Sequence, residues 1–176
     1  MFELSDSVSI DNKTYQVRTD FRVILEIFIM LNDPDLTDGD KAEALVRMFY
    51  IDRPADTEAA VSAFASFVDP RPRRAATRPG LVDWEADFDF IAAGVNHVLG
   101  TECRALPYLH WRTFLGAYME ISPDSLFTRV ISIREKVRYG KKLEKWERAW
   151  YRRNKDLVDL PMKYSVDEKA LLEEWT

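Results

Sequence analysis

The chain has 176 residues, of which 47% are hydrophobic and 31% charged, and its formal net charge is −5. This balance is typical of a globular protein and excludes collagen-like, low-complexity and intrinsically disordered classes. A single cysteine, Cys103, and two histidines, His97 and His110, exclude an intrachain disulfide framework and leave little material for a metal centre. We therefore expect a packed protein of a reducing compartment that needs no cofactor.

Alternating apolar residues around an Asp-Asn turn predict a β-hairpin over residues 8–17. Thr19 is expected to cap the helix that follows, and Asn32-Asp33-Pro34 to end it. This helix is apolar on most sides, which predicts a central position in the core. It is interrupted by Glu26 and is shorter than the roughly 20 apolar residues that span a bilayer. Because the N-terminus also lacks a secretory pattern, we expect no membrane segment.

Helical spacing of apolar residues predicts further helices after this point. Their expected starts are Thr37 or Asp38, Thr57, Asp83, Pro107 and Ser122. The Pro- and Arg-rich stretch over residues 69–82 is expected to be a flexible loop.

Residues 141–160 are expected to form a long basic helix at the C-terminal end. An apolar seam keeps a/d spacing along it, with Arg153 at the one polar position; its members are Leu143, Trp146, Trp150, Leu157 and Leu160. A second stripe beside the seam is basic and consists of Lys141, Lys145, Arg148, Arg152 and Lys155. Pro161 should end the helix, and the acidic tail over residues 161–176 is compatible with one more short helix.

These patterns together predict a mostly α fold. We expect a compact multi-helix domain over residues 1–160, with the short hairpin at its start and the long basic helix at its end.

Catalytic signatures are absent or weak in this sequence. It has no Gly-rich phosphate loop and no metalloprotease or serine hydrolase motif. On a helix, the alternating acidic residues from Asp83 to Asp89 would point in different directions and could not converge on one metal ion. A capped helix start is therefore favoured over a metal site. Arg104 would lower the pKa of Cys103, but no histidine lies close in sequence to activate the thiol. We therefore expect no enzymatic activity; a small enzyme with an unfamiliar site is the third alternative.

Charge is distributed unevenly along the chain. Residues 1–70 hold 14 acidic and 6 basic side chains, whereas residues 129–155 hold 11 basic and 3 acidic ones. Such asymmetry favours docking to a charged partner. It is also compatible with head-to-tail self-association into rings or open helical arrays.

Two interpretations of the basic segment remain open beside a purely structural one. Exposed apolar and basic stripes are typical of a surface that binds another helix. The binding residues would then be Lys141, Lys145, Trp146, Arg148, Trp150, Arg152, Arg153 and Lys155. Lysine and arginine interleaved with tryptophan over residues 141–155 are also typical of single-strand nucleic-acid binding, although the acidic remainder of the chain disfavours it. In the structural interpretation, Trp146 and Trp150 pack on the core and the basic stripe is simply solvated.

Four sequence blocks, taken in order, resemble a small protein family of siphophages that infect Gram-positive bacteria. These are TDFR at 19–22, followed by an acidic helix ending in Tyr50, then WEADFDFI at 84–91, LHWRTF at 109–114 and FTRVISIR at 127–134. The resemblance spans residues 8 to about 160 and is weaker over 69–82 and at the C-terminus.

The resemblance implies a tail assembly chaperone, encoded beside the tail tube and tape measure genes. Such a protein coats the helical tape measure protein and helps to recruit tail tube protein, without catalysis. It implies action in the host cytoplasm during assembly and absence from the mature virion. A frameshifted longer form accompanies the short form in many tailed phages.

Overall fold

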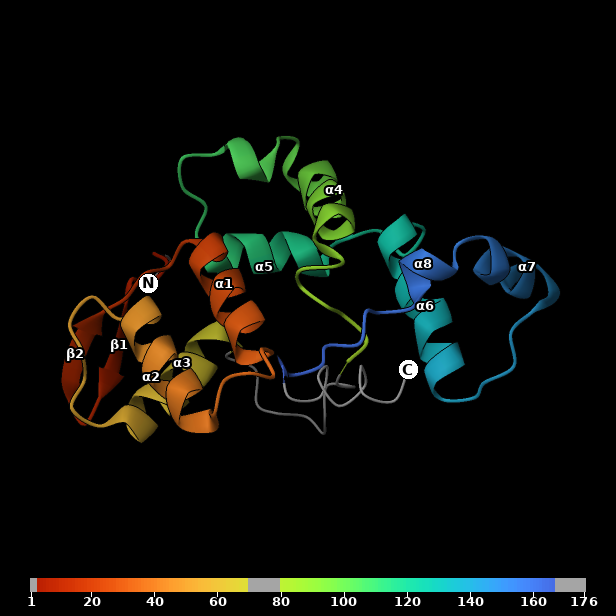
Figure 1. The fold of residues 1–176 in the computed structure, drawn as a ribbon. Helices are drawn as coiled ribbons and strands as arrows, with labels where there is room; N and C mark the ends of the chain where they lie inside the picture. The colour runs from red at the N-terminus through yellow and green to blue at the C-terminus, as the bar shows by residue number, and fades with distance from the viewer. Residues whose placement is uncertain (1–2, 70–79, 167–176) are drawn as a thin grey trace. The chain divides into compact units, whose positions relative to one another are not determined.

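The computed structural model describes residues 3–69 and 80–166, and these form a mostly α fold with one hairpin, as predicted (Figure 1). The elements in chain order are β1 (Ser7–Ile10), β2 (Lys13–Gln16), α1 (Phe21–Leu31), α2 (Asp38–Phe49), α3 (Thr57–Val68), α4 (Phe88–Leu99), the 3-10 turn η1 (Cys103–Ala105), α5 (Trp111–Met119), α6 (Leu126–Arg138), α7 (Lys145–Arg153) and α8 (Lys155–Val158). No helix within the described residues combines the length and the apolar character that a bilayer crossing requires.

The chain packs into two compact units, each built from separate stretches of sequence. Of the described residues, the first unit takes 3–69, 108–114 and 162–166, and the second takes 80–107 and 115–161. The prediction of a single domain over residues 1–160 did not anticipate this division. The predicted loop at 69–82 and the predicted tail helix fall largely on residues 70–79 and 167–176, which lie outside the described part of the chain.

The first unit is built around an aromatic core. Phe49 packs edge-on against Phe64 with ring centroids 5.0 Å apart, and Phe28 packs edge-on against Trp111 at 5.6 Å. Phe21 is fully buried and stacks on Phe114 at 4.5 Å. The central position predicted for the 21–31 helix is confirmed, because α1 supplies four of the buried residues.

Backbone hydrogen bonds join the blocks TDFR and LHWRTF in this unit. The Phe21 amide donates to the Leu109 carbonyl at 3.0 Å, and the Trp111 amide donates to the Thr19 carbonyl at 2.7 Å. Asp20 caps α1 by accepting from the Arg22 amide, and its other carboxylate oxygen accepts from the Leu109 amide at 3.2 Å. The helix cap is therefore Asp20, and the prediction of Thr19 was wrong by one residue.

The second unit is organised around a buried ion pair between the other two blocks. Arg134 on α6 donates from Nη1 and Nη2 to the Asp87 carboxylate at 2.8 and 3.0 Å. Both side chains are almost inaccessible, at 7% and 2% exposure. Arg134 also donates to the carbonyls of Leu81, Leu157 and Val158, so one side chain joins three separate stretches of chain.

Several predicted helix starts were too early. Residues 84–87 form turns stabilised by the Asp83 side chain, which accepts from the amides of Glu85 and Ala86, and α4 begins only at Phe88. In the same way, α5 begins at Trp111 instead of Pro107, and α6 begins after its cap Ser125 instead of Ser122. The caps Thr37 for α2 and Asp56 for α3 lie within one residue of the predicted starts.

The predicted long basic helix over 141–160 is wrong in its length. The structure places two short helices there, α7 and α8, separated at Asn154. Asn154 has non-helical backbone angles (φ −130°, ψ 37°), and its side-chain amide donates to the Trp150 carbonyl at 2.8 Å, which caps the end of α7. Asn competes for backbone groups in this way and so favours helix ends.

Candidate partner-binding surface

The candidate surface lies on α7 and is held in place by one acidic residue. Glu147 is only 4% exposed, although it belongs to a helix with four basic side chains. It accepts a 2.6 Å hydrogen bond from Lys136 Nζ on α6 and another, at 2.8 Å, from the Glu144 amide. The Lys136 hydrogen bond is the main cause that lowers the pKa of the Glu147 carboxyl below its usual range. The side of α7 that carries Glu147 therefore faces the interior of the second unit.

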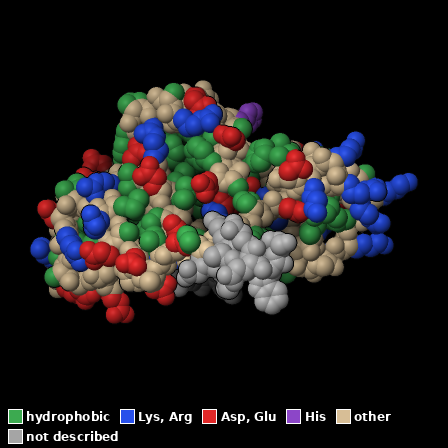
Figure 2. All heavy atoms as spheres, in the orientation of Figure 1, with side chains coloured by type: hydrophobic (Ala, Val, Ile, Leu, Met, Phe, Trp, Pro, Cys, Tyr) green, Lys and Arg blue, Asp and Glu red, His purple; other side chains and the backbone are tan. Residues whose placement is uncertain are grey.

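The side of α7 away from Glu147 carries exposed basic residues and a tryptophan. Trp146 is 58% exposed, which is large for an aromatic side chain. Lys145, Arg148, Arg152 and Arg153 are exposed beside it. We call these five residues the basic α7 surface. Figure 2 shows lysine and arginine side chains gathered over the end of the second unit that carries α7.

The eight predicted binding residues divide into three groups. Five of them form the basic α7 surface. Trp150 is half-buried, and Lys141 and Lys155 flank α7. Lys141 pairs with Glu135 at 2.8 Å, and Lys155 lies 3.8 Å from Asp159, so both charges are partly neutralised.

The predicted apolar seam is not continuous. The break at Asn154 removes Leu157 from the helix that carries the two tryptophans, and Leu143 lies before α7 begins. The structural interpretation is wrong for Trp146, whose side chain is mostly exposed. Trp150, however, is half-buried and the basic stripe is exposed to solvent, as that interpretation expected.

Sequence reasoning missed the residues that position this surface. Glu144 and Glu147 have the three-residue spacing of a capping box, and that signal was available in the sequence. The Lys136 partner was not, because the two residues lie on different helices. Exposed Val137 and Tyr139 precede α7 and also escaped notice.

Other candidate residues have structural roles. The His110 ring accepts from the Arg112 amide through Nδ1, and its Nε2 lies 3.1 Å from the Ser5 carbonyl. Burial, together with the charge of Glu102, raises the pKa of the Cys103 thiol, contrary to the lowering expected from Arg104. Within residues 3–69 and 80–166, no group of three or more His, Cys, Asp or Glu side chains is arranged to hold a metal ion.

The comparison with protein families gives a match in the first unit. Residues 2–73 match the family model described as Bacteriophage Gp15 protein. This match indicates a bacteriophage protein family, and it covers β1 through α3 but not α7. No curated protein and no solved structure matches the chain.

Proposed function

We propose that this protein is a phage tail assembly chaperone that binds tape measure protein through the basic α7 surface. The family match supports a phage role, and the four sequence blocks resemble the chaperone family over most of the chain. The observation that carries the proposal is the exposure of Trp146, at 58%, among cationic side chains on a helix anchored from its opposite side.

The chemistry of this surface suits a helical partner with acidic and apolar residues. An exposed tryptophan supplies apolar contact area, and aromatic and Arg residues are the side chains most enriched at binding hot spots. Contacts through exposed charges are individually weak, about 0.2–1 kcal/mol for an ion pair. Many copies bound along one long partner would compensate through multivalency. Weak single contacts also permit the release that recruitment of tail tube protein requires.

The proposal places the protein in the host cytoplasm during assembly and outside the mature virion. It assigns no catalytic step.

Co-expression with tape measure protein tests this function. We expect the chain to keep the partner soluble and to co-purify with it at moderate salt. Trp146→Asp should abolish co-purification. Met119→Asp is the matched control, because Met119 is similarly exposed, at 54%, and lies on another helix. Loss of binding in both variants, or in neither, would contradict the assigned surface.

The nucleic-acid alternative uses the same residues and is separated by a second measurement. It predicts retention on single-stranded DNA that falls steeply with salt, because released counterions drive such binding. Retention at low salt, with no association with tape measure protein, would favour the alternative over the chaperone.

A further inference from the structure

One edge of the hairpin is open. The hairpin is the whole sheet within the described residues, and β1 and β2 pair in antiparallel register with Ile10 opposite Lys13. Beyond the outer edge of β2, the Ile51 amide donates to the Gln16 carbonyl at 3.0 Å. Along the outer edge of β1, no backbone group of the described residues forms a comparable hydrogen bond. Unpaired strand edges are templates for another strand.

The hairpin register shows which groups face this edge. Asp11 and Asn12 form a tight turn with positive φ (48° and 64°) closed by Ile10 and Lys13. The Val17 amide donates to the Asp6 carbonyl at 2.9 Å, so the backbone groups of Asp6 and of every second residue after it face β2. The backbone groups of Ser7 and Ser9 therefore face away from β2. The Ser5 hydroxyl lies 2.8 Å from the Ser7 carbonyl and 3.3 Å from its amide, which covers Ser7. Ser9 is left as the open position on the edge.

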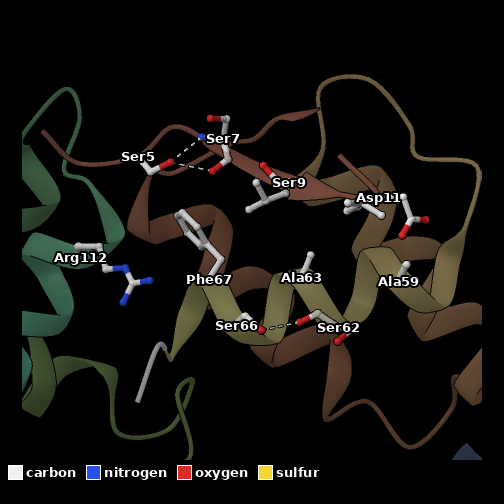
Figure 3. Close-up of a pocket in the computed structure, with 12 residues that line it drawn as sticks. Ser5, Ser7, Ser9, Asp11, Ala59, Ser62, Ala63, Ser66, Phe67 and Arg112 are labelled. Carbon is white, nitrogen blue, oxygen red and sulfur yellow. Dashed lines mark hydrogen bonds between the residues drawn. The ribbon is translucent and has the colours of Figure 1, made fainter. Parts of the chain in front are cut away.

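A groove of about 570 Å³ runs between this edge and α3 (Figure 3). The α3 side of the groove has small side chains at helical spacing, namely Ala59, Ser62, Ala63 and Ser66. Ser62 and Ser66 are exposed, and the two alanines are half-buried. α3 is therefore only partly covered by the hairpin, and its small face permits close approach of another backbone.

The two ends of the groove carry opposite charges. Asp11 lies at the turn end, and Arg112 lies at the other end, near Ser5 and Phe67 (Figure 3). The Arg112 guanidinium is 5.4 Å from the centre of the Phe67 ring, which holds it at the mouth of the groove. A partner with the same charges in reverse order would match both ends.

We propose that this groove binds the same groove of a second copy of the chain, with β1 pairing antiparallel to β1 across a two-fold axis at Ser9. The pairing would join two hairpins into a four-stranded sheet. Two-fold pairing reverses the order of the ends, so Asp11 of each copy meets Arg112 of the other. The small faces of the two α3 helices would lie side by side beneath the sheet, where helices pack about 8–10 Å apart.

The second copy is the occupant that satisfies all three features at once. A free edge offers a row of backbone hydrogen bonds that a strand can complete and a helix cannot. The small face permits close approach of a neighbour, and the end charges match a partner with the ends reversed. Among homo-oligomers, two-fold dimers with self-complementary interfaces are the commonest form. This inference is independent of the basic α7 surface and of the proposed function.

Disulfide cross-linking tests the pairing directly. Residues opposite each other in a hydrogen-bonded antiparallel pair have Cα atoms about 5.5 Å apart, within the range for a disulfide. Two Ser9→Cys thiols, oxidised by a copper–phenanthroline catalyst with oxygen as the electron acceptor, would form one disulfide. The native thiol, Cys103, is buried. Thr14→Cys is the matched control, because Thr14 is also exposed and lies opposite Ser9 on β2.

We expect the Ser9→Cys chain to form covalent dimer at least tenfold faster than the Thr14→Cys chain. Equal rates, or no dimer from Ser9→Cys, would overturn the proposal. Sedimentation equilibrium on uncross-linked chains gives a second measurement. Asp11→Lys and Arg112→Glu should each weaken dimerisation at least tenfold, and their combination should restore it. A monomeric wild type at all concentrations, or no restoration in the double variant, would also overturn it.

Discussion

Arg134 and Asp87 meet through two hydrogen bonds, at 2.8 and 3.0 Å, although they lie 47 positions apart in the chain. Asp87 also accepts from the Asp83 amide at 2.9 Å. Each residue belongs to one of the blocks by which the sequence resembles a phage family. These block residues therefore serve the architecture of the second unit.

We expect Arg134→Met to destabilise the second unit by about 3–5 kcal/mol, since removing one partner of a buried ion pair leaves an uncompensated charge. Urea unfolding followed by circular dichroism measures the loss. Arg129→Met, at an exposed position on the same helix, is the control and should change stability by less than about 0.5 kcal/mol. Equal effects of the two substitutions would show that the ion pair is not what stabilises this unit.

Stability should fall at alkaline pH because of Tyr50. Burial, with a smaller contribution from Tyr15, raises the pKa of Tyr50 to about 12, and its hydroxyl donates to the Ala60 carbonyl at 2.8 Å. A phenol in the unfolded chain titrates near about 10. The contribution is therefore complete below pH 10 and is lost as pH rises toward 12. Thermal unfolding as a function of pH should show this decline, and Tyr50→Phe should flatten it. A decline that persists in Tyr50→Phe, as in the control Tyr139→Phe, would assign it to other groups.

The contact between Glu147 and Lys136 should stabilise α7 locally. Its carboxyl pKa is lowered chiefly by the hydrogen bond from Lys136, so its contribution is present above the unfolded value, about 4.3, and is lost as pH falls through the lower folded value. At neutral pH, Glu147→Gln removes the ion pair while keeping the size of the side chain. Amide hydrogen exchange in residues 145–153 should then accelerate without change in α1. Glu120→Gln, at an exposed site, should leave α7 protected, and unchanged exchange in both variants would count against the anchor.

Substitution of the buried Trp111 should cost much more stability than substitution of the exposed Trp146. Trp111 is 2% exposed and donates from Nε1 to the Val68 carbonyl at 3.0 Å, whereas Trp146 is 58% exposed. Trp111→Ala should cost about 3–5 kcal/mol of unfolding free energy, as for other large-to-small core changes. Trp146→Ala should cost less than about 0.5 kcal/mol, as for surface changes. Similar losses, measured by chemical denaturation, would mean that Trp146 belongs to the core after all.

Much of the fold follows from local patterns in the sequence. The hairpin is predicted by its turn residues, and α2 and α3 by their caps, because these signals act within four residues. Helix starts were less well predicted where an aspartate forms turns before the helix, as Asp83 does. The break at Asn154 was missed because the heptad spacing continues through it.

The candidate surface was predicted in composition but not in orientation. Charge and spacing identified the basic stripe and Trp146. Which side of α7 faces inward depends on Lys136, a partner on another helix that periodicity cannot reveal. The groove beside β1 likewise depends on Arg112, which lies far along the chain from β1 and α3.

The discontinuous first unit has a consequence for synthesis on the ribosome. Phe21 stacks on Phe114, and α1 is fastened to residues 109–111, so the segment that matches the family model lacks part of its own core. The nascent chain must reach Phe114 before this core can close, and most of the intervening residues belong to the other unit. The first unit therefore cannot complete its aromatic core until residues 80–107 of the second unit have also been synthesised.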